Sequence, residues 1–239
     1  PVFDLDKGNL MKQQLISFLI VFVIGSVCSS ILFAAGDLQR GKEKYKVCVA
    51  CHGDNGEGSK ITNAPRISGQ KSWYIARQLN NFKQGIRGTH LDDITGMQMR
   101  PMAMSLYTDK DIEDIVAYID TLDGRGKHSG INGNIEAGKS AYSVCLTCHG
   151  ANGEGNTALN SPKIAGLPDW YVERQLHNFK NGIRGVHPKD IYGQQMRPMA
   201  MTLASDQAIR DVTAYVSTLK GVSSSRTSGV KSSKVAAVV

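Results

Sequence analysis

The sequence reads Cys48-Val49-Ala50-Cys51-His52 and, 97 residues further on, Cys145-Leu146-Thr147-Cys148-His149. Each stretch has two cysteines separated by two residues, with a histidine directly after the second one. Sliding the chain against itself by 97 residues aligns 41–122 with 138–219 without a gap, and 47 of the 82 positions are identical. This period is far longer than the roughly 20–50 residues of solenoid repeats. We therefore expect two domains, each with its own core.

The motif Cys-x-x-Cys-His is the attachment signature of c-type haem. The spacing has a chemical reason, because two thiols add to the two vinyl groups of one porphyrin and the adjacent imidazole binds the iron. Two disulfides or zinc half-sites are the alternatives, but they leave both histidines unexplained, and a four-Cys zinc site needs both copies to converge. The motif predicts two covalently bound haem c groups on Cys48, Cys51, Cys145 and Cys148, with His52 and His149 as iron ligands.

Each repeat has the same expected layout. Short helices are predicted over about 37–48 and 135–145, and apolar residues at helical spacing predict another over 73–82. A loop rich in Gly and Met follows in each copy. Capping signals at Thr108 and Ser205 then begin a last amphipathic helix. No convincing alternating strand pattern is present, so the predicted fold class is all-α.

The N-terminal segment has the features of a secretory signal peptide, with a positive start, an apolar run and small residues at its end. Met11 is the expected translation start, so residues 1–10 are upstream or added sequence and 11–35 form the signal peptide, cleaved after Ala34 or Ala35. An uncleaved membrane anchor is the alternative, because the run approaches the roughly 20 residues that a span needs. Export predicts a periplasmic location.

The remaining chain divides by composition. We expect a first domain over 36–126, a polar, Gly-rich linker over 127–134, a second domain over 135–221 and a disordered tail over 222–239. The two domains carry similar, small positive charges within a net charge of +7. A nucleic-acid binder would cluster its basic residues on one element. The five cysteines are too few for a disulfide scaffold.

A second iron ligand is expected from the methionines before the last helix of each repeat. A thioether opposite the histidine raises the reduction potential. Met97 is not repeated, because Gln194 takes its place in the second copy, so it is set aside as a ligand. His90 and His187 also repeat, so two-histidine ligation is the rival. The surviving methionine pairs are Met99 with Met196, Met102 with Met199, and Met104 with Met201.

Over about 37–220 the chain resembles the dihaem class I cytochromes c of the periplasmic cytochrome c-four type. The resemblance is carried by Cys48–Gly53, Gly56–Gly58, Pro65–Gly69 and Tyr74–Leu79, and by the matching stretches of the second copy. It implies two tandem class I cytochrome c domains, each wrapped around one covalent haem c.

The resemblance also implies site residues. The family's axial methionine usually lies four residues before a leucine, which assigns Met102 and Met199 to iron. One extra residue before the helix cap and the surplus of methionine keep Met99 and Met196 as the alternative. A proline carbonyl commonly accepts the histidine ring N–H, a role that falls to Pro65 and Pro162. Six further residues either contact the haem propionates or have a plain core or surface role: Trp73, Tyr74, Arg77, Trp170, Tyr171 and Arg174.

The function implied is one-electron carriage, without catalysis and without a small-molecule substrate or nucleic acid. Its partners would be redox proteins: a quinol-oxidising complex, a terminal oxidase or reductase, or a dehydrogenase. A loose membrane association stays open. The alternative is a haem-bearing subunit of a larger redox enzyme, such as a sulfide or other cytochrome-linked dehydrogenase. A dihaem peroxidase is less favoured, because near-identical methionine segments argue against one open iron.

Overall fold

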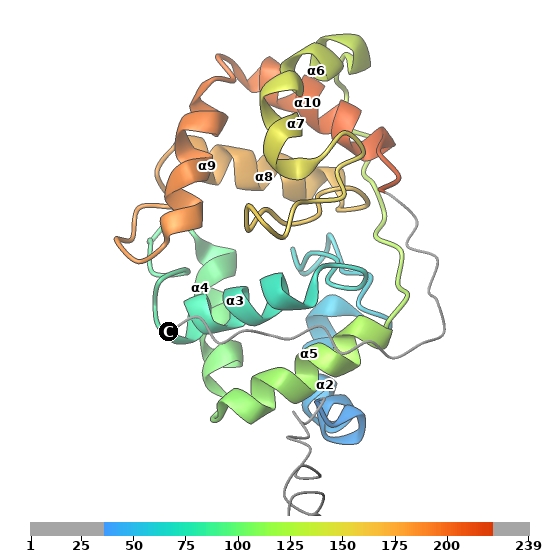
Figure 1. The fold of residues 1–239 in the computed structure, drawn as a ribbon, viewed down its shortest axis with the longest axis vertical. Coiled ribbons are helices and arrows are strands. Elements are labelled where there is room, and N and C mark those ends of the chain that lie inside the picture. Colours follow the sequence, from blue (N-terminus) through green and yellow to red (C-terminus); the bar gives the residue numbers. More distant parts are fainter. Residues whose placement is uncertain (1–35, 222–239) are drawn as a thin grey trace, which may run out of the picture. The chain divides into compact units, whose positions relative to one another are not determined.

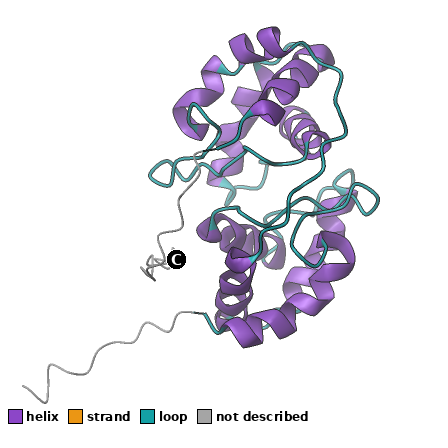
Figure 2. Cartoon of the chain, turned by 90° about the vertical axis from the view of Figure 1, so that its right-hand side faces the viewer, coloured by secondary structure: helices purple, strands orange, loops and turns teal. Residues whose placement is uncertain are grey.

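The computed structural model describes residues 36–221. The predicted signal peptide, the residues before it and the predicted tail lie outside the described residues. Between residues 36 and 221 all regular elements are helices, apart from two isolated β-bridges (Figure 2). The all-α prediction is confirmed.

Four helices form the first repeat (Figure 1): α2 (Leu38–His52), α3 (Ser72–Lys83), α4 (Ile94–Met104) and α5 (Asp109–Thr121). Helix α2 packs against α5, and α3 contacts both α4 and α5. The core between them is built from Tyr45, Ile75, Leu106, Ile112, Ile115, Val116, Ile119 and Leu122.

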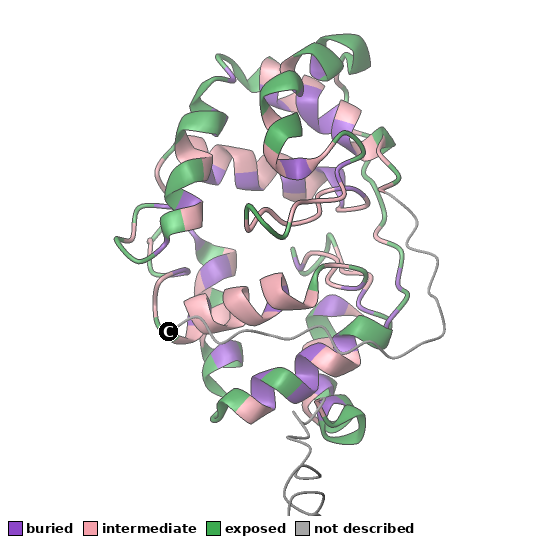
Figure 3. Cartoon of the chain, in the orientation of Figure 1, coloured by how far each residue is buried: buried purple, intermediate pink, exposed green. Residues whose placement is uncertain are grey.

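The second repeat follows the same plan with one more break: α6 (Ile135–Ala141), α7 (Ser143–His149), α8 (Asp169–Lys180), α9 (Ile191–Met201) and α10 (Asp206–Thr218). Helix α6 packs against α10, and α8 contacts α9 and α10. Figure 3 draws buried residues along α10 and α5, where each repeat has its core. The predicted helices are present, with two differences at the start of each repeat. Helix α2 runs four residues further than predicted, through His52, and the helix predicted over 135–145 is divided into α6, which ends at Ala141, and α7, which ends at His149.

Glycine allows the first helix of each repeat to cross the last one closely. A Cβ on Gly41 would lie 2.0 Å from the Asp114 carbonyl oxygen of α5, and one on Gly138 would lie 1.9 Å from that of Asp211. Only a residue without a side chain fits at such a distance. The repeated glycine therefore allows the Cys-x-x-Cys-His segment to cross its partner helix this closely.

The methionine segments are helices, so the prediction of a loop there was wrong. Helices α4 and α9 begin at Asp capping residues, since Asp93 accepts from Gly96 N and Asp190 from Gly193 N, both at 3.0 Å. Each contains a proline, which removes a backbone donor and ordinarily costs about 3 kcal/mol in a helix interior. The caps and the packing against α3 and α8 offset this cost.

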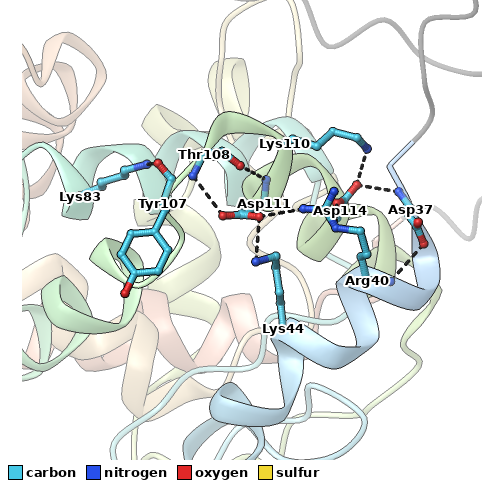
Figure 4. Close-up of polar contacts among 9 residues, drawn as sticks. All are labelled: Asp37, Arg40, Lys44, Lys83, Tyr107, Thr108, Lys110, Asp111 and Asp114. Atoms are coloured by element: carbon cyan, nitrogen blue, oxygen red, sulfur yellow. Dashed lines mark hydrogen bonds and ion pairs between the residues drawn. The ribbon is translucent and has the colours of Figure 1, made fainter.

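The last helices begin where the sequence predicted. Thr108 and Asp111 form a reciprocal capping box, and Ser205 accepts from Ala208 N at 3.1 Å. Helix α5 also carries a cluster of charges that faces α2 (Figure 4). In it Asp111 lies 2.7 Å from the Lys44 ammonium.

Candidate haem sites

The two cysteines of each motif lie one turn apart on the same helix face. Cys48 is half-buried and Cys51 exposed, and neither forms a disulfide. Burial, followed by the neighbouring Cys51, raises the pKa of the Cys48 thiol to about 11, and the Cys145 thiol reaches about 11 for the equivalent reasons. Thiols of this kind are protonated at neutral pH and are poor thiolate nucleophiles. A raised thiol pKa is the opposite of the lowered pKa that activates a reactive dithiol centre.

The two motif histidines are buried and held in one orientation. His52 Nδ1 lies 2.8 Å from the Pro65 carbonyl oxygen, and His149 Nδ1 lies 2.9 Å from that of Pro162. Because a carbonyl only accepts, Nδ1 carries the proton and donates, which leaves the Nε2 lone pair for a metal. Burial lowers the pKa of both rings although the hydrogen bond opposes it, so both stay neutral.

A buried tyrosine supports the end of each motif helix. Tyr45 Oη donates to the Gly53 carbonyl at 2.7 Å, and Tyr142 Oη donates to the Gly150 carbonyl at 2.7 Å. These glycines end the helices directly after the histidines, with φ of 79° and 81°. Sequence reasoning gave neither tyrosine a role, although both copies place one three residues before the first cysteine.

The candidate axial methionines all lie on α4 and α9. Met102 is 44% exposed and Met199 is 38% exposed, whereas Met99 and Met196 are half-buried. Within residues 36–221, no three His, Cys, Asp or Glu side chains converge on one metal position. The assignment of Met102 and Met199 to iron stays a prediction.

The aromatic and arginine residues connect the two repeats. The Arg77 guanidinium lies 4.8 Å from the Trp73 ring and 4.2 Å from the Tyr192 ring, and it donates to the Asn160 carbonyl at 2.9 Å. Arg174 makes the matching bond to the Asn63 carbonyl, also at 2.9 Å. Tyr74, Trp170 and Tyr171 belong to the same stacks. Their predicted contact with haem propionates stays a prediction.

The residues present fit a c-type haem. Each repeat supplies two thiols on one helix face, a neutral imidazole with Nε2 free of the proline carbonyl, and thioethers on a separate helix. This donor set matches covalent attachment with one nitrogen and one sulfur ligand for iron.

Comparison with known proteins agrees with this fit. The family model described as Cytochrome c matches residues 38–123 and again 135–220. Cytochrome c4 of Thiocapsa roseopersicina is 34% identical over 194 residues, which cover 76% of this chain and 92% of the relative. The crystal structure of reduced recombinant cytochrome c4 from Pseudomonas stutzeri is 28% identical, with a TM-score of 0.60 over 77% of this chain and 100% of its own.

Another relative is named as an electron acceptor. This thiosulfate dehydrogenase electron acceptor of Stutzerimonas stutzeri is 27% identical over 179 residues, which cover 70% of this chain and 76% of the relative. Among the helices of residues 36–221, none is both long and apolar enough to cross a membrane.

Proposed function

Because this chain belongs to the cytochrome c family, with two cytochrome c domains of the c4 type in tandem, we propose that it carries single electrons between periplasmic redox proteins through two His/Met-ligated haems. Membership of the family supports a dihaem electron carrier with two covalently bound haem c groups. Beyond this, we propose the iron ligands, the partners and the compartment. Each haem supplies an iron that alternates between the ferrous and ferric states.

The observation that carries the proposal is the anchored histidine in both copies. A ring fixed at Nδ1 by a backbone carbonyl presents Nε2 in one direction and as a neutral ligand, in either oxidation state. A ligand that does not move when the electron arrives keeps reorganisation small. The near-identical geometry of the two copies supports two closed irons instead of one closed and one open.

Met102 and Met199 are proposed to close the sixth position of each iron. Both come from helices that pack in the same repeat as their histidine, and both are partly exposed on those helices. Thioether ligation favours the ferrous state and raises the potential, which suits a carrier that accepts electrons from a dehydrogenase or quinol-oxidising complex.

Two kinds of partner follow. A freely diffusing carrier would hand electrons to a terminal oxidase or reductase. The second candidate is a dedicated partner of one dehydrogenase, and the printed name of the thiosulfate dehydrogenase electron acceptor favours it. Co-purification of a catalytic chain with the exported protein would separate the dedicated partner from the general carrier.

Substitution of the methionines tests the ligation. In the purified holoprotein, Met102→Ala and Met199→Ala should each remove about half of the Met–iron charge-transfer band and open one iron to carbon monoxide. The matched variants Met99→Leu and Met196→Leu should keep the whole band. Loss of the band in the Met99 and Met196 variants, with its retention in the other pair, would reverse the assignment. Retention in all four variants would assign the iron to Met104 and Met201, and absence of the band from the unaltered protein would favour His90 and His187.

A further inference from the structure

One buried carboxylate at the start of α8 accepts four hydrogen bonds. It belongs to Asp169, the first residue of the helix, which is 1% exposed. Its Oδ1 accepts from the Ser129 backbone N–H at 2.7 Å, from the Ser129 hydroxyl at 2.9 Å and from the Trp170 N–H at 2.8 Å. Its Oδ2 accepts from the Ile131 N–H at 3.0 Å. Three of the four bonds therefore come from the linker, residues 127–134.

The Asp169 carboxylate is held by these bonds and not by a counter-ion. Burial alone would raise its pKa, but the N–H groups of Ser129, Ile131 and Trp170 outweigh burial and the pKa is lowered. Between residues 36 and 221, no cationic side chain lies within ion-pair distance of it. A charge buried in this way depends on its hydrogen-bond donors. The linker supplies most of the interactions that keep this charge buried.

The linker backbone is shaped to reach the carboxylate. Gly130 lies between the two donor residues and has a φ of 73°, in the left-handed region that favours glycine. With this turn, the N–H groups of Ser129 and Ile131 converge on one carboxylate, as in the anion-binding concavities that nearby backbone N–H groups form. Nothing lies within 4 Å of a Cβ placed on Gly130, so the backbone conformation alone favours glycine there.

The first repeat shows that the helix itself does not need this carboxylate. Ser72 takes the matching position, and its hydroxyl donates to the Asp120 carboxylate at 3.1 Å. Helices α3 and α8 nevertheless have the same length, 12 residues each. An acid in the first turn favours the helix dipole, but an exposed acid does so without the cost of burial. The buried bonds of Asp169 therefore serve the linker and not the helix.

Composition alone would make this linker a preferred site of proteolysis. It is polar and rich in glycine, and exposed Arg125 and Lys127, after which trypsin cuts, lie at its start. A protease needs a released stretch of backbone and not only an exposed side chain, so its rate follows the population of the open state. The bonds to Asp169 hold the backbone just after Lys127. The structure and the composition therefore give opposite expectations for cleavage.

The chain between the repeats is fixed at three points. Gly124 is held in the first repeat, because its carbonyl accepts from the Ser68 hydroxyl at 2.6 Å. Asn134 is held in the second repeat, because its N–H donates to the Asp211 carboxylate at 2.7 Å. Asp169 fixes the chain midway between them. Removing its carboxylate would release the whole segment between the other two points.

We propose that Asp169 is a latch: its ionised carboxylate fastens the linker to the second repeat and so protects the chain from being cut into two single-haem halves. The single-haem halves rest on the proposed function, since each half needs its own haem. The fastening itself rests on the buried carboxylate and its linker donors.

Limited trypsin digestion of the purified holoprotein tests the latch. Asp169→Ser installs the residue type that the first repeat has at this position, so α8 should still form. We expect cleavage after Arg125 or Lys127 to become about ten- to a hundredfold faster, because charge-assisted hydrogen bonds no longer hold the linker closed. Asp206→Asn is the matched control, since Asp206 is the first residue of α10 and its side chain is 72% exposed. This control should be cut at the rate of the unaltered protein.

Mass spectrometry of the intact fragments identifies cleavage in the linker and the haem on each half. Equal linker cleavage rates in Asp169→Ser and Asp206→Asn would overturn the latch, and so would rapid linker cleavage of the unaltered holoprotein. Failure of the proposed function is detected separately. Halves without haem, or carbon monoxide binding by the reduced uncut protein, would contradict that function without changing the comparison of cleavage rates.

Hydrogen exchange in the unaltered holoprotein covers the case in which Asp169→Ser does not mature. Relative to the intrinsic rate of each amide, the N–H groups of Ser129 and Ile131 should be protected at least about tenfold more than those of His128 and Gly130. The latter two make no hydrogen bond within residues 36–221. Equally fast exchange at all four amides would overturn the latch without any substitution.

Discussion

His52 Nδ1 lies 2.8 Å from the carbonyl oxygen of Pro65, a residue 13 positions further along the chain. The second repeat holds His149 and Pro162 in the same relationship, at 2.9 Å and with the same separation. The Gly-rich loop between them is therefore part of the metal site, since it returns to buttress the histidine that precedes it. A histidine at the end of a helix would otherwise be free to rotate.

Loss of the tyrosine hydroxyl beside this histidine should loosen the end of the motif helix. Tyr45→Phe removes the donor to the Gly53 carbonyl and leaves a partly buried acceptor without a partner. We expect the holoprotein to lose about 1 to 3 kcal/mol of unfolding free energy in urea denaturation. Tyr107→Phe, at a side chain 82% exposed, is the control and should have almost no effect. Equal losses in both variants would contradict a specific role for the Tyr45 hydroxyl.

The two haems should attach independently. The buried core clusters of the two repeats share no residue, and each motif helix packs within its own repeat. The double variant Cys145→Ser, Cys148→Ser should therefore retain one covalent haem on Cys48 and Cys51. Mass spectrometry of the exported protein should find one haem per chain. Accumulation of a stable chain with no haem at all would argue that attachment in the first repeat depends on the second.

The stability of the first repeat should fall more at acid pH than the stability of the second repeat. Lys44 and then the Thr108 N–H lower the pKa of Asp111 despite its burial, while Ala208 occupies the matching position of the second repeat. A lowered carboxyl pKa contributes stability above the unfolded pKa of about 4 and loses it as the pH falls. Asp111→Asn keeps an oxygen for the helix cap but removes the charge.

We expect Asp111→Asn to cost about 1 to 2 kcal/mol of unfolding free energy at pH 7, in proportion to a charge-assisted hydrogen bond. The difference from the unaltered protein should shrink as the pH falls below about 4. Urea unfolding at a series of pH values measures it. A difference that stays constant over this range would show that the Asp111 charge does not contribute through its ionisation.

Local signals predicted the framework of the fold well. Thr108 and Ser205 were recognised as helix caps because capping depends on residues three positions apart. The motif histidines were recognised because haem attachment demands a fixed short spacing. These features are encoded within a few residues, so one sequence suffices to find them.

Features that depend on packing were missed. The segments around Pro101 and Pro198 were assigned to a loop, because proline and glycine ordinarily interrupt helices, whereas caps and packing sustain α4 and α9. The bond from Arg87 to Gln175 joins residues 88 positions apart, and no local pattern predicts it. Arg87 and Arg184 occupy matching positions in the two copies, but that identity does not indicate which residues they contact.

We propose that both irons are closed by protein ligands and serve only to carry electrons. The sharpest test is a visible-spectrum redox titration of the exported holoprotein, with carbon monoxide added to the reduced form. We expect two low-spin haems at positive potential, a Met–iron band in the oxidised form and no response to carbon monoxide. A high-spin component, or carbon monoxide binding at one haem, would reveal an open iron and contradict closed coordination of both irons.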